Sequence, residues 1–333
     1  MMFSKSKLPI LKKYYLYSLD HIYFLNILLL PFSILYLSIN LIKKYFFSNK
    51  RNNTIPVIVV GNLTVGGTGK TSLVIWLCNY FSSRKYNVAV ISGGYKTTDP
   101  NKIQIVNKDS KANEVGDEAI LIGKKTQSIV CKCKNRKLAY EFLVKNYKLD
   151  FIISDDGLTH YKLNRNLNIV IVKENKPFGN GLVLPAGPLR ELPSSINSYD
   201  NVIFNKSKKS NVSGFYYDIS KLKSILNNTE LDIEILSGTS VHLVTAIANP
   251  DLLIKSLNRY NVDIIPHIYP DHYLPIEEDF IFSDNLKTIM TEKDFVKCCD
   301  FNLENAYYLP TKIIVDNDIK IMLNNQISNL LKV

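Results

Sequence analysis

The feature that most constrains the fold is a glycine-rich stretch, VGNLTVGGTGKTSLVIW, at residues 60–76. The apolar run PVIVV at residues 56–60 leads into it and predicts a buried strand. From Thr71 onward, apolar side chains recur at helical spacing, at Leu73, Val74, Leu77 and Phe81. A strand, a glycine turn and a helix N-terminus together aim backbone N–H groups and the helix dipole at a phosphate group. The stretch therefore predicts a phosphate-binding loop; a glycine turn without a ligand is the alternative.

The loop departs from the strict pattern G-x-x-x-x-G-K-[ST], because Thr64 stands where the first glycine of that pattern belongs. Three closely spaced glycines still allow the backbone to curl round an anion. In this geometry the Lys70 amine reaches the terminal phosphates of a nucleotide and the Thr71 hydroxyl binds Mg²⁺. We therefore predict nucleotide contacts along the whole loop, at Thr64, Val65, Gly66, Gly67, Thr68, Gly69, Lys70 and Thr71.

A pair of carboxylates follows another apolar run. The stretch DFIISDDG at residues 150–157 ends such a run with Asp155 and Asp156. An acid at the carboxyl end of a parallel strand faces the ligand crevice, and Mg²⁺ beside a nucleotide needs a carboxylate ligand. Asp-Asp-Gly by itself is common in turns. In the same chain as Lys70 and Thr71, it predicts the metal-binding carboxylate.

Short apolar runs alternate with amphipathic stretches over the first two thirds of the chain. The runs predict buried strands at residues 56–60, 87–92, 128–132, 150–154, 167–172 and 201–204. Helices are predicted between some of them, at residues 71–85 and 116–126. This order predicts an α/β fold like that of P-loop NTPases, with a mostly parallel sheet and helices on both faces.

We expect four segments along the chain. Residues 1–45 form a region with a hydrophobic, membrane-associating helix, and residues 46–205 form the phosphate-loop domain. Residues 206–239 are polar and rich in Asn, Lys and Ser, which predicts a linker. A second series of apolar runs begins at residue 240, so residues 240–333 are expected to form a smaller α/β domain.

The N-terminal segment contains 22 residues, 21–42, without Asp, Glu, Lys or Arg. As a helix it would be about 33 Å long, close to the ~30 Å thickness of a bilayer's hydrocarbon core. Asn26 and Pro31 interrupt it, so a helix that spans the bilayer and one that lies in the interface both remain open. A signal peptide and a buried internal helix are the alternatives. Lysines flank both ends, and we predict membrane association.

The net charge of +11 favours anionic partners, and nucleic acid, anionic lipid or a phosphorylated substrate would all satisfy it. The five cysteines form no C-x-x-C pair and are too few for a disulfide framework in a chain of this length. We therefore expect reduced thiols without a structural metal.

Six further polar clusters occur in a characteristic order. They are SGGY (92–95), GDEA (116–119), DDGLTH (155–160), PFGNGLVLPAGPLRE (177–191), YPDHY (269–273) and TEKD (291–294). Together with GNLTVGGTGKT, they make the chain resemble the tetraacyldisaccharide 4'-kinase family over nearly its whole length. The resemblance implies transfer of the ATP γ-phosphoryl group to the 4'-hydroxyl of a lipid disaccharide 1-phosphate, at the cytoplasmic face of the inner membrane.

The resemblance also implies partners and site residues. ATP and Mg²⁺ are the expected cofactors, and the partners are the lipid substrate and inner-membrane lipid, with no nucleic acid and no obligate protein partner. Arg190 would lie beside the phosphates. The expected catalytic residues are Asp117, His272, Lys70 and Asp156, and the expected metal ligands are Thr71, Asp155 and Glu191. In this arrangement Asp117 and His272 form an acid–histidine pair that orients the acceptor hydroxyl.

A membrane-anchored ATPase switch that acts through protein partners is the alternative. Switch ATPases of that kind carry a lysine where this chain has Val65, which favours the kinase. The chain also departs from the kinase pattern. Gly93 replaces an arginine, so a cationic contact is expected to be missing, and Ala119 and Thr159 replace a proline and a glutamine. The TAIANP segment at residues 245–250 departs as well.

Overall fold

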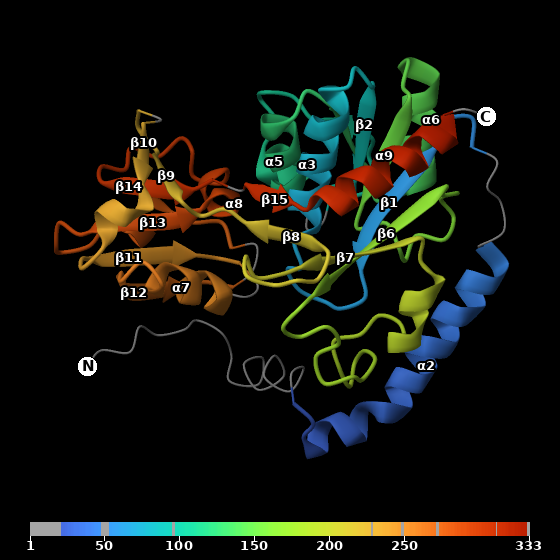
Figure 1. The fold of residues 1–333 in the computed structure, drawn as a ribbon, viewed down its shortest axis with the longest axis horizontal. Coiled ribbons are helices and arrows are strands. Elements are labelled where there is room, and N and C mark those ends of the chain that lie inside the picture. Colours follow the sequence, from blue (N-terminus) through green and yellow to red (C-terminus); the bar gives the residue numbers. More distant parts are fainter. Residues whose placement is uncertain are drawn as a thin grey trace. The chain divides into compact units, whose positions relative to one another are not determined.

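The computed structural model describes residues 21–47, 53–94, 97–227, 229–247, 250–270, 273–310 and 312–331. These residues divide into two compact units, which are treated separately below (Figure 1). The larger unit contains the described residues up to 216 and those from 314 onward. The smaller unit contains those from 217 to 313.

The larger unit is built on a nine-stranded sheet with the order β15-β8-β7-β6-β1-β5-β2-β4-β3. From β8 to β4 every neighbouring pair is parallel, and β3 pairs antiparallel with β4 at one edge. The strands are β1 (Val57–Asn62), β2 (Val88–Ser92), β3 (Gln104–Ile105), β4 (Ile129–Lys132), β5 (Phe151–Asp155), β6 (Leu167–Lys173), β7 (Asn201–Asn205), β8 (Gly214–Tyr217) and β15 (Ile313–Val315). The mostly parallel sheet and all six strands expected from the apolar runs are confirmed.

Helices cover both faces of this sheet. The helices of the larger unit are α2 (Phe24–Phe47), α3 (Lys70–Ser82), α4 (Ala112–Val115), α5 (Asp117–Lys125), α6 (Arg136–Asn146), the 3₁₀ helix η1 (Pro193–Ser198) and α9 (Asn317–Leu331). Val57 and Val59 of β1 pack in one core with Ala139 and Leu143 of α6. Because strand side chains alternate, Ile58 and Val60 face the opposite side. Burial on both faces explains why these strands read as unbroken runs of Val and Ile.

The smaller unit contains a six-stranded mixed sheet with the order β10-β9-β14-β13-β11-β12. Its strands are β9 (Lys221–Ser224), β10 (Glu230–Asp232), β11 (Ser240–Thr245), β12 (Asp263–Ile268), β13 (Lys287–Thr291) and β14 (Ala306–Leu309). Its helices are η2 (Ile233–Leu236), α7 (Asp251–Asn258), η3 (Glu277–Phe280) and α8 (Glu292–Phe295). Its core contains Leu222, Val241, Leu243, Leu257 and Ile289. The expected second α/β unit is therefore present.

The division of the chain differs from the expected segments in two places. Residues 206–239 were expected to be a linker, but they contain β8, β9, β10 and η2. These strands are short and lie toward sheet edges, so polar residues are tolerated there. The C-terminal helix α9 belongs to the larger unit, where Gln326 exchanges hydrogen bonds of 2.7 and 3.0 Å with Asn201 of β7. Polar contacts of this kind cannot be predicted from the spacing of apolar residues, so the sequence did not indicate that α9 belongs to the larger unit.

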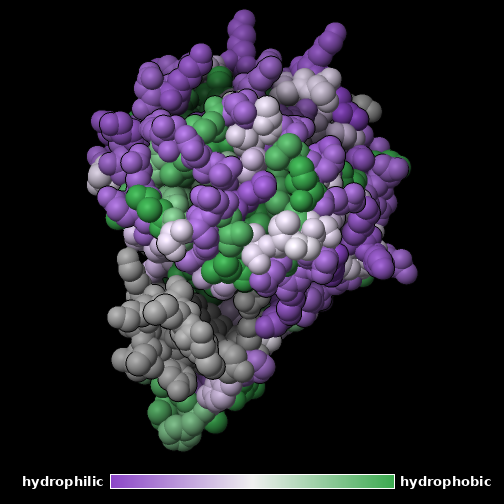
Figure 2. Space-filling model, turned by 90° about the vertical axis from the view of Figure 1, so that its left-hand side faces the viewer, coloured by the Kyte–Doolittle hydropathy of each residue, from purple (hydrophilic) through white to green (hydrophobic). Residues whose placement is uncertain are grey.

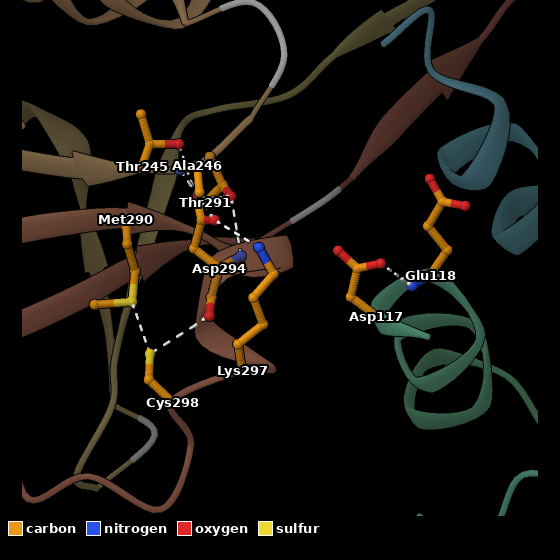
Figure 3. Close-up of polar contacts among 9 residues, drawn as sticks. All are labelled: Asp117, Glu118, Thr245, Ala246, Met290, Thr291, Asp294, Lys297 and Cys298. Carbon is orange, nitrogen blue, oxygen red and sulfur yellow. Dashed lines mark hydrogen bonds and ion pairs between the residues drawn. The ribbon is translucent and has the colours of Figure 1, made fainter. Parts of the chain in front are cut away.

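The TEKD motif organises the smaller unit around the buried Asp294 (Figure 3). Its carboxylate accepts hydrogen bonds from the Thr291 hydroxyl at 2.7 Å, the Thr245 hydroxyl at 2.8 Å and the Ala246 amide at 3.2 Å. Lys297 lies 3.4 Å away and is almost fully buried with it. A buried carboxylate needs this number of donors to offset its loss of hydration. Asp294 therefore joins the ends of β11 and β13.

Helix α2 buries two polar side chains and exposes most of its apolar ones. Asn26 and Ser33 are its two buried residues, whereas most of its Leu, Ile, Phe and Tyr residues are exposed. The Asn26 amide donates to the Ala186 carbonyl at 2.6 Å. The Ser33 hydroxyl donates to the Val183 carbonyl at 2.8 Å and accepts from the Ala186 amide at 3.0 Å.

The helix is long and apolar enough to cross a membrane. Its first turns form the hydrophobic surface at the lower end of the space-filling view (Figure 2). Helix α2 is thus held to the protein by polar contacts and presents an apolar surface. The five cysteines form no disulfide among the described residues, and four of them are buried.

Ser33→Ala should loosen α2 from the 183–186 segment, because two buried hydrogen bonds are lost. We expect a cost of about 1–3 kcal/mol, measured as faster amide hydrogen exchange along α2. Ser38→Ala is the matched control, because the exposed Ser38 hydroxyl donates only to the Ile34 carbonyl of its own helix. Equal exchange in the two variants would show that the Ser33 contacts do not hold the helix.

Candidate phosphate-binding site

The glycine-rich loop connects β1 to α3 as its sequence predicts. Helix α3 begins at Lys70, and Gly69 before it has φ 93°. Gly66 has φ 99°, so both glycines lie in the left-handed region where side chains are disfavoured. Gly66 and Gly67 are exposed, and a Cβ atom added at either would meet no other atom within 4 Å. The loop therefore presents open backbone at a helix N-terminus, as an anion site requires.

The first half of the loop is paired with a distant segment of the chain. The Val65 amide donates to the Pro188 carbonyl at 2.8 Å, and the Arg190 amide donates to the Leu63 carbonyl at 2.7 Å. Thr64 and Leu189 form an antiparallel bridge between these two bonds. This pairing brings the LPAGPLRE motif against the glycine-rich loop and places Arg190 at the end of β1.

Three charged side chains meet beside the loop. The Arg190 guanidinium donates to both carboxylate oxygens of Asp156, at 2.8 and 3.3 Å. The Lys70 amine lies 3.7 Å from the same carboxylate and donates to the Asn62 side-chain carbonyl at 3.0 Å. Burial alone would raise the pKa of Asp156, but the charges of Lys70 and Arg190 hold it below its ordinary value. Asp156 is therefore a carboxylate that holds two cations at the edge of the sheet.

Asp155 has a different environment from its neighbour. It is 2% exposed, and its Oδ2 accepts a hydrogen bond from the Thr71 hydroxyl at 3.3 Å. Burial and the nearby charges of Glu118 and Asp156 raise the pKa of Asp155 to about 7. Its other oxygen, Oδ1, is buried and has no partner among the described residues.

This oxygen set fits Mg²⁺, which prefers one or two carboxylates together with hydroxyl and phosphate oxygens. The unpartnered Oδ1 of Asp155 and the adjacent Thr71 hydroxyl are the two ligands that the predicted arrangement needs. Within the residues that the structure describes, no group of three or more His, Cys, Asp or Glu side chains is arranged to hold a metal by itself. The protein alone therefore offers part of a coordination shell.

Glu191 lies apart from the other two predicted metal ligands. Its carboxylate accepts a hydrogen bond from the Tyr161 hydroxyl at 2.9 Å and lies 3.5 Å from the Lys44 amine of α2. It also raises the pKa of Tyr199, after burial, which is the larger cause. The contacts of these two adjacent residues differ: Arg190 binds Asp156, whereas Glu191 binds Tyr161 and lies near Lys44 of α2. Both carboxylate oxygens of Glu191 thus have protein partners, and its metal-binding role stays a prediction.

Asp117 is the first residue of α5, and it is buried. Its Oδ1 accepts a hydrogen bond from the Glu118 amide at 3.0 Å (Figure 3). The Glu118 charge acts on Asp155, so the start of α5 lies near the carboxylates at the end of β5. His272, the predicted partner of Asp117, lies outside the described residues.

Several residues of this site escape sequence reasoning. Asn62 binds the Lys70 amine, Glu118 acts on Asp155, and the Asn205 amide donates to the Thr68 carbonyl at 3.1 Å. Arg136 donates from Nη2 to the backbone carbonyl of Asp155 at 2.6 Å. Asn62 and Glu118 stand inside motifs noted above, which is a usable signal. Asn205 and Arg136 carry none, because only the fold brings them to this edge of the sheet.

Comparison with known proteins identifies a single family. The model of the tetraacyldisaccharide-1-P 4'-kinase family matches residues 25–328. The tetraacyldisaccharide 4'-kinase of Ruthia magnifica subsp. Calyptogena magnifica is 36% identical over 88% of this chain and 95% of its own length. That of Pseudoalteromonas translucida is 37% identical over 92% and 93%. The structure of LpxK from Aquifex aeolicus in complex with ATP is similar with a TM-score of 0.73, at 27% identity over 91% of this chain and 99% of that one.

The site makes the stability of the protein sensitive to acid through His160. Burial, and then the Arg136 charge, lower the pKa of His160 to about 4, whereas an unfolded histidine titrates near 6.5. The folded state therefore resists protonation, and stability is lost as pH falls from about 6.5 to about 4.

His160→Gln should remove up to about 3 kcal/mol of this loss. Urea unfolding at pH 7.5 and pH 4.5 measures it, because the variant should lose less stability between the two pH values than the unsubstituted protein. Identical losses in both proteins would contradict the assignment.

Proposed function

The chain belongs to the tetraacyldisaccharide 4'-kinase family, and on that premise we propose how its residues carry out the transfer. Its activity is that of a phosphotransferase in lipid A biosynthesis, which moves the γ-phosphoryl group of ATP to the 4'-hydroxyl of a tetraacyldisaccharide 1-phosphate. The residue assignments rest mainly on one observation: Lys70 and Arg190 both contact the Asp156 carboxylate beside an open glycine-rich loop.

The loop and its cations bind the phosphates. The backbone amides of residues 66–71 line the N-terminus of α3, where the helix dipole favours negative charge. Lys70 reaches the β- and γ-phosphates, and Arg190 neutralises the equatorial oxygens of the transferred group. Asp156 holds both cations in place, since its carboxylate contacts both in the folded protein. Catalysis of this reaction consists mainly of such positioning and charge stabilisation.

Thr71 and Asp155 would hold Mg²⁺. When bound, the ion would neutralise part of the phosphate charge that develops during transfer. One oxygen of the Asp155 carboxylate accepts from the Thr71 hydroxyl and the other has no partner among the described residues, which supports this role. We do not assign Glu191 to Mg²⁺ binding, because its carboxylate contacts Tyr161 and Lys44.

Asp117 is proposed to orient the acceptor hydroxyl and accept its proton. Its position at the first turn of α5, near Glu118 and the carboxylates of β5, supports this role. His272 would pair with it, as the resemblance implies. In a loose phosphoryl-transfer transition state the hydroxyl proton leaves late, so orientation contributes more than base strength.

The surface of this chain is suited to bind a lipid substrate and a membrane. Helix α2 presents an apolar surface, and a net charge of +11 attracts an anionic glycolipid and an anionic leaflet. We place the enzyme at the cytoplasmic face of the inner membrane, acting without nucleic acid and without an obligate protein partner. The alternative of a membrane-anchored switch is disfavoured by Val65 and by the LPAGPLRE and DDGLTH motifs.

The transfer is tested with purified protein, γ-labelled ATP and the disaccharide 1-phosphate in mixed micelles. We expect label in the lipid with the unsubstituted protein and none above background with Lys70→Ala, because the amine that reaches the phosphates is gone. Circular dichroism of Lys70→Ala should match that of the unsubstituted protein. Clear ATP binding without labelled lipid would favour the switch, and normal activity of Lys70→Ala would refute the loop assignment.

Asp117→Asn tests the acceptor side, because the amide keeps the hydrogen bond from Glu118 but cannot accept a proton. We expect kcat to fall by about 10²–10⁴ and the affinity for ATP to stay nearly constant. Steady-state kinetics with both substrates varied, together with calorimetric ATP binding, measures the two effects. A loss confined to ATP affinity would assign Asp117 to the nucleotide site instead.

A further inference from the structure

The guanidinium of Arg136 is buried at the carboxyl edge of the larger sheet. Arg136 is the first residue of α6 and is 4% exposed. Its Nη2 donates to the backbone carbonyl of Asp155 at 2.6 Å. Its Nε and Nη1 have no hydrogen-bond partner among the described residues. A buried guanidinium remains charged, so this placement has an energetic cost that another interaction must offset.

The neighbouring acids supply that interaction. Burial lowers the pKa of Arg136, and the charges of Asp155, Asp156 and Glu118 act against that effect. Asp156 is also held by Lys70 and Arg190. Three cations therefore contact the turn after β5: Arg136 binds its backbone, and the other two contact the Asp156 side chain.

Gly93 provides the space for the Arg136 guanidinium. Gly93 follows the last residue of β2, the strand next to β5. A Cβ atom at Gly93 would lie 2.9 Å from Nη2 of Arg136, which is closer than real Cβ contacts allow, and 3.5 Å from Cζ, which is ordinary contact. The φ angle of Gly93 is not in the left-handed region, so its backbone conformation does not require glycine. Space for the guanidinium, and not backbone geometry, accounts for glycine at this position.

Gly94, the next residue, likewise leaves space for a buried cation, the side chain of Lys132. A Cβ atom at Gly94 would lie 2.5 Å from Cε of Lys132, whose side chain is fully buried. The Lys132 amine donates to the Gln104 side chain at 3.0 Å and to the backbone carbonyl of Asp99. The end of β2 is thus packed around two buried cations. Where the sequence pattern predicted a missing cationic contact, the fold supplies cations from β4 and α6.

We propose that Arg136 is a positioning residue for the Asp155–Asp156 turn, and that Gly93 is the residue that lets its guanidinium reach that turn. The bond to the Asp155 carbonyl fixes the peptide from which both carboxylates project. Asp156 has φ 50°, a left-handed conformation that a non-glycine residue keeps only where its surroundings hold it. The catalytic part of this inference rests on the proposed function, because it takes Asp155 and Asp156 to serve phosphoryl transfer. The packing part does not.

The packing is tested by a double-mutant cycle in thermal unfolding, which needs no activity. Gly93→Ala should lower the unfolding midpoint when Arg136 is present, because the new methyl group collides with Nη2. In the Arg136→Met background the same change should leave the midpoint unchanged or slightly raised, since Gly→Ala is favourable where φ permits it. Equal lowering in both backgrounds would overturn the packing claim. If Arg136→Met does not fold, Arg136→Lys replaces it, with the same non-additivity expected.

The positioning role is tested by kinetics on the full-length protein. Arg136→Met should lower kcat by about 10- to 100-fold, the usual cost of losing a residue that orients a ligand, while the KM for ATP changes little. Arg136→Lys should recover part of kcat, because a cation returns. Lys137→Met is the matched control: it removes a charge from the same helix at a position whose side chain is 62% exposed, and it should have no effect.

The outcomes distinguish the positioning role of Arg136 from the proposed function. An unchanged kcat in Arg136→Met, or a loss confined to ATP affinity, would overturn the positioning role. Absence of transfer by the unsubstituted protein would instead contradict the proposed function, and the thermal cycle would still decide whether Gly93 and Arg136 are coupled.

Discussion

The site depends on one pairing of backbone segments, that of residues 63–65 with residues 188–190. Two hydrogen bonds of 2.7 and 2.8 Å and one antiparallel bridge hold the start of the glycine-rich loop against the LPAGPLRE segment. Because of this pairing, Arg190 reaches Asp156, and Asp156 in turn reaches Lys70. Glu191 then points the other way, toward Tyr161 and the lysine at the end of α2. The same short segment thus connects the phosphate loop to the apolar helix α2.

Charge balance explains why so many ionisable groups are stable at this edge of the sheet. Asp155, Asp156 and Glu118 lie close together, and burial and mutual repulsion raise the pKa of Asp155 to about 7. Lys70, Arg190 and Arg136 offset those charges from different directions. Buried charges are tolerated only when they are paired in this way. An incoming polyanion therefore meets cations that are already oriented, which lowers the reorganisation needed for transfer.

Sequence reasoning succeeded where local pattern decides structure. Strands buried on both faces read as runs of Val and Ile, so β1 and β5 were predictable, and the positions of Lys70, Thr71 and Asp155 followed from them. Predictions from the sequence failed where tertiary contacts decide the structure. The sequence of strands β8 to β10 is polar, like that of a linker. The direction of the Glu191 side chain depends on a backbone pairing between residues more than 120 positions apart in the chain. Gly93 suggested a missing cation, because no local signal reveals that Arg136 fills the space.

A structure of this protein with Mg²⁺ and a non-hydrolysable ATP analogue tests the central claim most directly. We expect phosphate oxygens within about 2.7–3.2 Å of the Lys70 amine and the loop amides, with Arg190 at the γ-phosphate. We also expect the metal on the Thr71 hydroxyl and the Asp155 carboxylate, and Glu191 still bound to Tyr161. Phosphates bound away from residues 66–71, or a metal held by Glu191, would contradict it.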